Sequence, residues 1–197
     1  MKKDSMNGLL LTLRNRNLST PEFRKAAEKM SVLLLRKLKA VLNKDGVRSG
    51  EVSTVIILRA AVAMLPPMLH MFPGTSVGVL GLRRDEHTKR AHWYYEKLPP
   101  ISKKSIIVIL DPMLATGGSA SAAVSRLILR GADPRNIYFV GVIAAPSGVV
   151  RLAQKIPESH IILSIIDEGL DHDAMIVPGL GDFGDRYFGN IPTRSKK

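Results

Sequence analysis

The sequence contains no cysteine, which excludes a disulfide framework, a thiol nucleophile and any metal site built on thiolates. It also contains no uncharged apolar run long enough to cross a bilayer, so we expect no membrane segment. The first residues carry two lysines and a short apolar patch, but Asp4 precedes the patch and no small-residue cleavage site follows it. We therefore interpret this segment as part of the folded chain rather than as a signal peptide, and we expect a cytoplasmic protein.

Acidic residues are few: 17 Asp and Glu stand against 29 Lys and Arg, a formal net charge of +12. This excess predicts polyanionic partners such as nucleic acid, phosphorylated substrates or an anionic surface. The charge is densest in residues 14–44, in residues 83–90 and in the tail 194–197. For residues 14–44 we favour the simpler interpretation, a solvated basic face on a helix.

Hydrophobic periodicity predicts a single α/β domain. Apolar residues recur every three or four positions from Phe23 to Leu42, which predicts a helix to about Asn43 with Thr20 as its N-cap and Pro21 at its first position. Short apolar runs predict buried strands at Val52–Leu58, Val77–Leu80, Ser105–Leu110, Ile137–Ala145 and Ile161–Ile166. Helical segments are expected at Ala60–Met71, Ser119–Arg130 and Gly148–Lys155.

The alternation of strands and helices predicts a mostly parallel twisted sheet flanked by helices. The polar and aromatic stretch between Arg84 and Pro100 predicts a protruding hairpin. In such sheets, ligands bind beyond the carboxyl ends of the strands. Arg59, Arg83, Arg84, Asp111 and Asp167 are all expected at that edge.

The segment Asp111–Ser125, DPMLATGGSASAAVS, is the strongest functional signal in the chain. It places an acid at a strand end, then a hydroxyl, two glycines and a helix N-terminus. Unpaired amides in the first helical turn and the helix dipole favour an anion, and glycine allows close approach. The segment predicts a phosphate site in which Asp111 accepts hydrogen bonds from sugar hydroxyls. The alternative is an ordinary strand-to-helix turn.

A second loop has a similar pattern, a strand that ends in a polar residue and is followed by small residues and a helix. The strand Val52–Leu58 ends in Arg59, and two small residues and a helix follow. Arginine supplies a permanently charged, forked donor for an anion. Together with Arg84 after a third strand, the two loops predict a ligand that carries phosphate at both ends.

At this point the chain resembles the uracil phosphoribosyltransferases. The resemblance runs through most of Val52–Gly189 and rests on seven ordered blocks. They are ILRAA at Ile57–Ala61, GLRRDEHT at Gly81–Thr88, YYEKLP at Tyr94–Pro99, LDPMLATGGSA at Leu110–Ala120, AAPSG at Ala144–Gly148, IDEGL at Ile166–Leu170 and IVPGLGDFGDRYFG at Ile176–Gly189.

The resemblance implies the type I phosphoribosyltransferase fold with a small hood. Residues 1–45 would form an N-terminal helical segment, 52–166 the core sheet, 167–190 a base-binding hood and 191–197 a basic tail. The implied reaction converts uracil and 5-phosphoribosyl-1-diphosphate (PRPP) to UMP and diphosphate in pyrimidine salvage. It implies Mg²⁺ held mainly by PRPP rather than by protein ligands and a homodimer or higher homo-oligomer, and it allows a nucleotide effector.

The resemblance also implies roles for individual residues. The ribose 5-phosphate loop would comprise Asp111, Pro112, Met113, Leu114, Ala115, Thr116, Gly117, Gly118 and Ser119. Arg59 and Arg84 would contact the diphosphate, and Tyr94 and Tyr95 would lie on a closing flap. Uracil would be held by Ile176, Gly181, Asp182 and Phe183, largely through backbone groups. Asp182 would also lie against PRPP, and it could orient the base or accept its N1 proton.

Several of these residues have a purely structural interpretation. Asp182 and Asp185 could be turn-forming acids in a glycine-rich loop. Tyr94 and Tyr95 could simply pack a hairpin. The pair Asp167–Glu168 could be helix-start acids. The five histidines show no metal-ligand spacing, and we interpret them as surface or core residues.

The chain departs from the family pattern in three places. The segment between Asn43 and Val52 is shorter by about two dozen residues than the family's dimer-forming arm, and the His-Pro-Leu opening is missing. Ala60–Ala63 replaces a glycine-containing sequence, which would strain the loop if those positions need positive φ. Phe183 stands where alanine is usual, and its ring could narrow the pocket.

Two hypotheses from different classes follow. The leading one is an active salvage enzyme. The alternative is a non-catalytic phosphoribosyltransferase-fold regulator that binds RNA or another polyanion, supported by the net charge, the short arm and Phe183.

Overall fold

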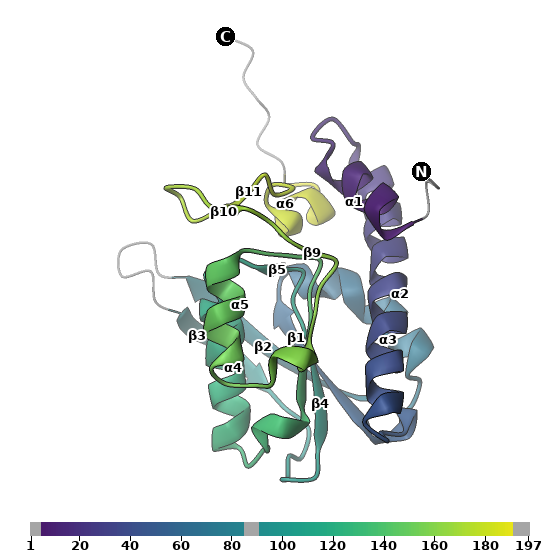
Figure 1. Cartoon of the computed structure of the whole chain (residues 1–197), viewed down its shortest axis with the longest axis vertical. Helices are drawn as coiled ribbons and strands as arrows, with labels where there is room; N and C mark the ends of the chain where they lie inside the picture. Colours follow the sequence, from purple (N-terminus) through teal and green to yellow (C-terminus); the bar gives the residue numbers. More distant parts are fainter. Residues whose placement is uncertain (1–4, 85–90, 191–197) are drawn as a thin grey trace.

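A six-stranded sheet forms the centre of the protein, as seen in a computed structural model that describes residues 5–84 and 91–190. The strand order is β3-β2-β1-β4-β6-β8 (Figure 1). The strands are β1 (Val52–Leu58), β2 (Ser76–Arg84), β3 (Ala91–Lys97), β4 (Ile106–Leu110), β6 (Ile137–Val140) and β8 (Ile161–Ile162). All neighbours are parallel except β2 and β3, which form an antiparallel pair. The predicted α/β class is confirmed. A hairpin is present, but its first strand is β2, which precedes the predicted start at Arg84, and residues 85–90 lie outside the described part of the chain.

The central strands are apolar on both faces because helices cover both. In β4, Val108 and Leu110 face the core shared with the N-terminal helices, whereas Ile107 and Ile109 face the core on the other side. Helices α2 (Thr20–Lys44) and α3 (Leu65–Met71) lie on one side of the sheet, and α4 (Gly118–Leu129) and α5 (Pro146–Ala153) lie on the other (Figure 1). This two-sided burial explains why strands of a parallel sheet appear as continuous apolar runs.

The long helix α2 begins at a different cap from the one predicted. Its N-cap is Ser19, not Thr20, and the Ser19 amide donates to Glu22 Oε2 at 3.0 Å. A serine followed three residues later by glutamate forms a capping box, which places Thr20 and Pro21 inside the first turn. The preceding helix α1 (Met6–Arg14) confirms that the N-terminal apolar patch is part of the folded chain.

Two of the predicted strands are each divided in two. Within Ile137–Ala145 the chain forms β6 and then β7 (Ile143–Ala144), and within Ile161–Ile166 it forms β8 and then β9 (Ile165–Ile166). Strands β7 and β9 pair with β5 (Met113–Leu114) in a separate parallel sheet. Gly141, where the first of these strands divides, packs closely on the loop after β4: a Cβ there would lie 2.9 Å from the carbonyl oxygen of Asp111. The small sheet extends the carboxyl edge of the large one.

The predicted helix Ala60–Met71 is also divided. A 3-10 turn, η2 (Ala60–Met64), precedes α3, which begins with two prolines in its first turn. Proline lacks the amide needed to continue a helix but suits its first turn, so a new helix starts there. Three further 3-10 turns are η1 (Ser49–Glu51), η3 (Pro134–Asn136) and η4 (Glu158–His160).

We define residues 167–190 as the hood. It contains the antiparallel pair β10 (Gly169–Leu170) and β11 (Ile176–Val177), followed by α6 (Phe183–Phe188). These elements lie beyond the carboxyl edge of the sheet, beside α1 (Figure 1). Among the described residues, no helix combines the length and the apolar character needed to cross a bilayer.

Candidate active site

Two loops that follow neighbouring parallel strands form the floor of the candidate site. Strands β1 and β4 pair in parallel, with Ile56 opposite Leu110. Arg59 directly follows β1, and Asp111 directly follows β4. The structure therefore brings the two predicted anion-binding loops to the same edge of the sheet. Arg84, at the end of β2, reaches this edge with its backbone, but its side chain is outside the described part of the chain.

Tight packing fixes the loop Asp111–Ser119. Gly117 has φ +71°, and a Cβ there would lie 2.9 Å from the carbonyl oxygen of Gly148. Conversely, a Cβ on Gly148 would lie 2.4 Å from the carbonyl oxygen of Ala115 and 2.6 Å from that of Leu114. Two segments of the family pattern, LATGG and AAPSG, thus contact each other directly. Glycine is required at both positions because backbone atoms occupy the space of a side chain.

The N-terminus of α4 opens from this loop with the features of an anion site. No side chain caps the helix at Gly117, and no acidic residue lies in its first turn. The hydroxyl of Thr116 accepts a long bond from the Gly118 amide at 3.4 Å. The first amides of a helix have no intrahelical partner and carry the positive end of its dipole. The loop can therefore bind a phosphate through backbone donors.

The carboxyl of Asp111 is partly buried at the start of this loop. The Met113 amide donates to Asp111 Oδ1 at 3.3 Å. Loss of hydration raises the pKa of Asp111 from its ordinary value of 3.8 to about 7, and the Met113 amide opposes this shift. A carboxyl with a raised pKa, next to a loop that offers backbone donors, is typical of a functional site.

The Arg59 loop begins with a cis peptide bond between Leu58 and Arg59, and the residues after it keep negative φ. Ala60–Met64 form the 3-10 turn η2, and among the described non-glycine residues only Ala174 has positive φ. The alanines that replace the family's glycines therefore cause no strain of the kind considered above. The Arg59 side chain is 59% exposed, and its Nη2 lies 3.1 Å from Asp185 Oδ1 on α6. Its guanidinium also lies 5.7 Å from the ring centre of Phe188.

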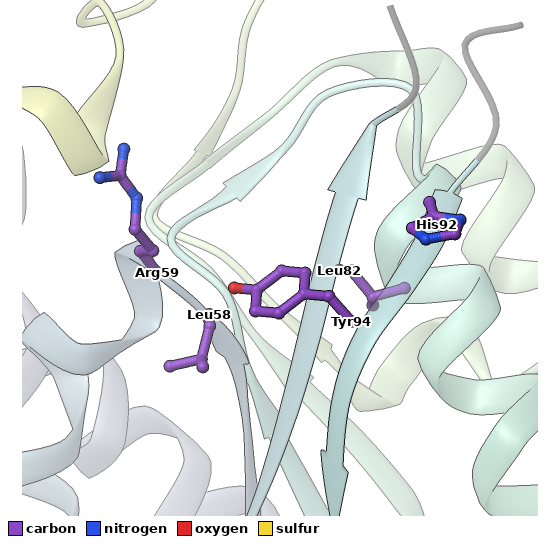
Figure 2. Close-up of a pocket in the computed structure, with 5 residues that line it drawn as sticks. All are labelled: Leu58, Arg59, Leu82, His92 and Tyr94. Atoms are coloured by element: carbon purple, nitrogen blue, oxygen red, sulfur yellow. The ribbon is translucent and has the colours of Figure 1, made fainter.

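A pocket of about 560 Å³ separates Arg59 from the hairpin. It is lined by Leu58, Arg59, Leu82, His92 and Tyr94, and Figure 2 shows the Tyr94 hydroxyl directed toward the Leu58 and Arg59 side. The ring of Tyr94 lies against Gly81, where a Cβ would be 2.5 Å from Tyr94 Cε2.

The hairpin residues have different environments. Tyr94 lines the pocket, and both Tyr94 and Tyr95 are about half exposed. His92 is an exposed residue, as expected, and it also lines the pocket, a position that the sequence alone did not indicate. The pairing of β2 with β3 shifts register between Gly81 and Leu82, whose partners are Tyr95 and Trp93, so regular alternation along β3 is interrupted at Tyr94 and gives no simple signal for His92.

The predicted base-binding segment forms a tight loop in the hood. Ile176 is buried, Gly179 and Gly181 have φ of +58° and +85°, and the Val177–Pro178 bond is cis. A Cβ on Gly181 would lie 2.2 Å from Arg16 Nη1. Asp182 is exposed and caps α6, because its Oδ1 accepts from the Asp185 amide at 2.8 Å. Asp182 therefore does form the turn contact that the structural interpretation predicted. This contact uses Oδ1 and leaves Oδ2 available.

The ring of Phe183 lies in the core. Phe183 is fully buried, and its ring meets that of Phe23 edge-on with centroids 5.1 Å apart. The ring is thus accommodated between α6 and α2 instead of in the pocket, and its backbone remains in the hood loop.

Two buried charged residues hold the hood. Asp167 was expected at the carboxyl edge of the sheet, but its partners were not: it pairs with Arg14 at 2.5 Å and accepts from the Gly179 amide at 2.9 Å. The second residue, Arg186, was not identified from the sequence. Arg186 donates to the carbonyl oxygens of Leu13, Leu180 and Asn15. Burial, and then the nearby charge of Arg16, lower the pKa of Arg186. Partners more than 150 positions apart give no local sequence signal.

Known proteins resemble this chain over nearly all of its length. The family model for uracil phosphoribosyltransferase matches residues 39–190. A uracil phosphoribosyltransferase of Acinetobacter baylyi is 39% identical, with 91% of this chain and 90% of the relative covered. One from Dictyoglomus turgidum is 40% identical, with 91% and 93% covered.

Solved structures agree with these relationships. The AQ2163 protein from Aquifex aeolicus superposes with a TM-score of 0.82 at 32% identity, covering 93% of each chain. An APRTase from Giardia lamblia complexed with 9-deazaadenine gives a TM-score of 0.53 at 16% identity, covering 75% of this chain and 81% of that one, which supports the fold alone. The family model and the identities across the full chain lead to one conclusion: this chain belongs to the uracil phosphoribosyltransferase family.

Proposed function

We propose that this protein transfers the phosphoribosyl group of PRPP to uracil, forming UMP and diphosphate. The observation that carries the proposal is the placement of two anion-binding loops at one sheet edge. The amide-rich loop at the N-terminus of α4 lies on one strand end, and Arg59 lies on the neighbouring strand end. A ligand with a phosphate ester and a diphosphate on one ribose matches this arrangement.

In this proposal the loop Asp111–Ser119 binds the ribose and its 5-phosphate. The amides at the start of α4 and the hydroxyls of Thr116 and Ser119 would bind the phosphate oxygens. The Asp111 carboxylate would accept hydrogen bonds from the ribose hydroxyls. Its raised pKa means that ligand binding, by adding donors around the carboxyl, would favour the ionised form.

The leaving group determines the main chemical requirement. As diphosphate departs, C1 of the ribose gains oxocarbenium character, and negative charge develops on the leaving oxygen. Arg59 and Arg84 would stabilise that charge, and a positioned guanidinium in a closed site is far more effective than one in bulk water. Tyr94 and Tyr95 on the hairpin would close over the site and exclude water, which suppresses hydrolysis of PRPP.

We propose that Mg²⁺ enters with PRPP, with the diphosphate and ribose oxygens as its main ligands. Mg²⁺ prefers oxygen ligands and usually joins a site through substrate phosphates. The oxygen atoms of the Asp111 carboxyl and of the Thr116 and Ser119 hydroxyls fit such a complex. When bound, the ion would neutralise part of the diphosphate charge.

Uracil would bind to backbone groups of the hood loop. Uracil presents one N–H donor between two carbonyl acceptors, and the loop at Ile176, Gly181 and Phe183 can offer both N–H and C=O groups. Glycine at 179 and 181 permits the positive φ that brings these groups close. Cytosine would leave partners unpaired, which costs more than a missing favourable contact. Asp182, adjacent to this loop, would orient the base and lie against PRPP.

We also propose a homodimer. The family membership supports it, as do the exposed apolar side chains of Ile165 and Ile166 on β9. The connection between α2 and β1 contains only the turn η1, so the dimer would form without a long arm in this segment. Light scattering of the purified protein would measure the mass.

The direct test is conversion of radiolabelled uracil to UMP in the presence of PRPP and Mg²⁺. We expect turnover with uracil and at least a hundredfold preference over cytosine. Absence of turnover would contradict the proposal. Tight RNA binding with steep salt dependence, unaffected by Asp111→Asn, would instead support the non-catalytic alternative.

A further inference from the structure

The Arg59 guanidinium points to the hood. Figure 2 shows the side chain extending away from Tyr94, toward the yellow hood segment. There Arg59 Nη2 lies 3.1 Å from Asp185 Oδ1, and the guanidinium lies over the Phe188 ring at 5.7 Å. In this structure, the Asp185 carboxylate therefore pairs with the guanidinium that we propose binds the diphosphate.

The position of Asp185 is set by its surroundings. Asp182 caps α6 and fixes the first turn through the Asp185 amide. Helix α6 lies directly on η2: a Cβ on Gly184 would be 3.7 Å from the Cβ of Ala60 and 3.2 Å from Asp182 Oδ1. Because Ala60 follows Arg59 in the chain, α6 and Arg59 cannot be far apart. The contact is thus built by the helix cap and by the small residues at the η2–α6 interface.

We propose that Asp185 is a positioning residue that competes with diphosphate for Arg59. In the free protein it holds the guanidinium at the hood, and on binding of PRPP or diphosphate the guanidinium exchanges the carboxylate for the ligand. This inference rests on the proposed function, because it assigns Arg59 to the diphosphate. An anion with several charges binds a guanidinium more strongly than one partly exposed carboxylate does, so the exchange is favourable.

The exchange links two parts of the site. Asp185 lies in the first turn of α6, three residues after Asp182 and four after Gly181 in the proposed base loop. Release of Arg59 from Asp185 removes one tie between this turn and the diphosphate loop. Binding at the diphosphate site therefore changes a contact of the proposed base loop, and the sheet need not rearrange.

The test is a double-mutant cycle on the binding of inorganic pyrophosphate with Mg²⁺, measured by calorimetry without uracil. The proteins are the wild type, Asp185→Asn, Arg59→Ala and the double variant, over a ligand range that suits the weakest of them. Asp173→Asn is the matched control, because Asp173 is also a hood acid, with a side chain 73% exposed. Thermal unfolding of each protein shows whether α6 remains intact.

We expect Asp185→Asn to bind pyrophosphate about two- to fivefold more tightly, the range expected when an exposed ion pair no longer competes. In the Arg59→Ala background the same change should have no effect, because the residue through which it acts is missing. Asp173→Asn should match the wild type. A general charge effect would strengthen binding equally in both backgrounds, and a purely structural role would weaken it in both; either result would overturn the inference.

The experiment also separates this inference from the proposed function. Failure of the wild type to bind pyrophosphate at all would overturn the diphosphate site itself and the inference with it. Normal binding that Arg59→Ala weakens, with no coupling to Asp185, would refute the positioning role alone. In steady-state assays, the positioning role predicts a lower KM for PRPP in Asp185→Asn.

Discussion

Arg14 and Asp167 form a buried ion pair that joins α1 to the hood, with 2.5 Å between Nη2 and Oδ1 and an Asp167 side chain 1% exposed. The second oxygen of Asp167 accepts from the Gly179 amide at 2.9 Å. One carboxylate thus ties the N-terminal helix to the loop proposed to bind uracil. The N-terminal helix α1 is therefore fixed against the hood.

Replacing Asp167 by alanine should destabilise the protein by about 3 kcal/mol, because it leaves a largely buried guanidinium and an amide without their acceptor. It should also raise KM for uracil more than KM for PRPP, since Gly179 belongs to the proposed base loop. Urea unfolding and steady-state kinetics measure the two effects. Asp173→Ala, an exposed hood acid, should remain within about 0.5 kcal/mol of the wild type. Equal stability of the two variants would show that the pair does not hold the hood.

A single added methyl group at Gly148 should damage the phosphate loop. In Gly148→Ala, the new Cβ would lie 2.4 and 2.6 Å from two backbone oxygens of that loop, so the loop must move. We expect KM for PRPP to rise at least about tenfold, because positioning errors of this size are costly in catalysis. Gly74→Ala is the control, since its Cβ would meet nothing within 4 Å and its φ is not in the left-handed region. Unchanged kinetics in Gly148→Ala would contradict the packing described here.

Phe183 should contribute to stability rather than to base selection. Its fully buried ring packs on Phe23, so Phe183→Ala should cost about 3–5 kcal/mol through the lost transfer energy and the cavity left behind. Uracils with a bulky group at C5 should gain no rate relative to uracil, because the ring does not lie in the pocket. A selective gain for such analogues would mean that the ring limits the base site. Phe183→Leu offers a milder variant if the alanine protein unfolds.

The carboxyl of Asp111 should make stability depend on pH. Burial raises the pKa of Asp111 to about 7, so between pH 4 and pH 7 the folded protein binds a proton that the unfolded chain has released. Stability from this group is therefore present at low pH and is lost as pH rises through about 7. Relative to Asp111→Asn, the wild-type free energy of unfolding should fall by about 2 to 3 kcal/mol between pH 5 and pH 8. Parallel curves for the two proteins would show that the carboxyl is ordinary.

Local patterns predicted the parts of the fold that local physics determines. The strands before Arg59 and Asp111 and the helix after Gly118 follow from apolar runs and glycine placement. Ser19 was missed as the cap because Thr20 is also a good cap, and the decision depends on the Glu22 side chain. The division of two predicted strands could not be foreseen. Strands β7 and β9 are as apolar as β6 and β8, so hydrophobic periodicity does not mark the residue at which the chain passes from one sheet to the other.

In the site, too, local features could be predicted from the sequence, whereas contacts between distant residues could not. Glycine-rich loops at strand ends could be recognised from the sequence, and the family resemblance assigned them a ligand. Three contacts of the site join residues more than 100 positions apart: the ion pairs Arg14–Asp167 and Arg59–Asp185 and the hydrogen bond from Arg186 to Leu13. No spacing rule connects such residues, so the three-dimensional structure is needed to find them.

A crystal structure with UMP bound tests the central claim most directly. The account predicts the phosphate of UMP on the backbone amides between Thr116 and Ser119, the ribose hydroxyls on Asp111, and the base against the backbone of Gly181. Arg59 would lie on the side where diphosphate leaves. A phosphate bound instead to the basic face of α2, with the loop after β4 empty, would contradict the assignment of the site.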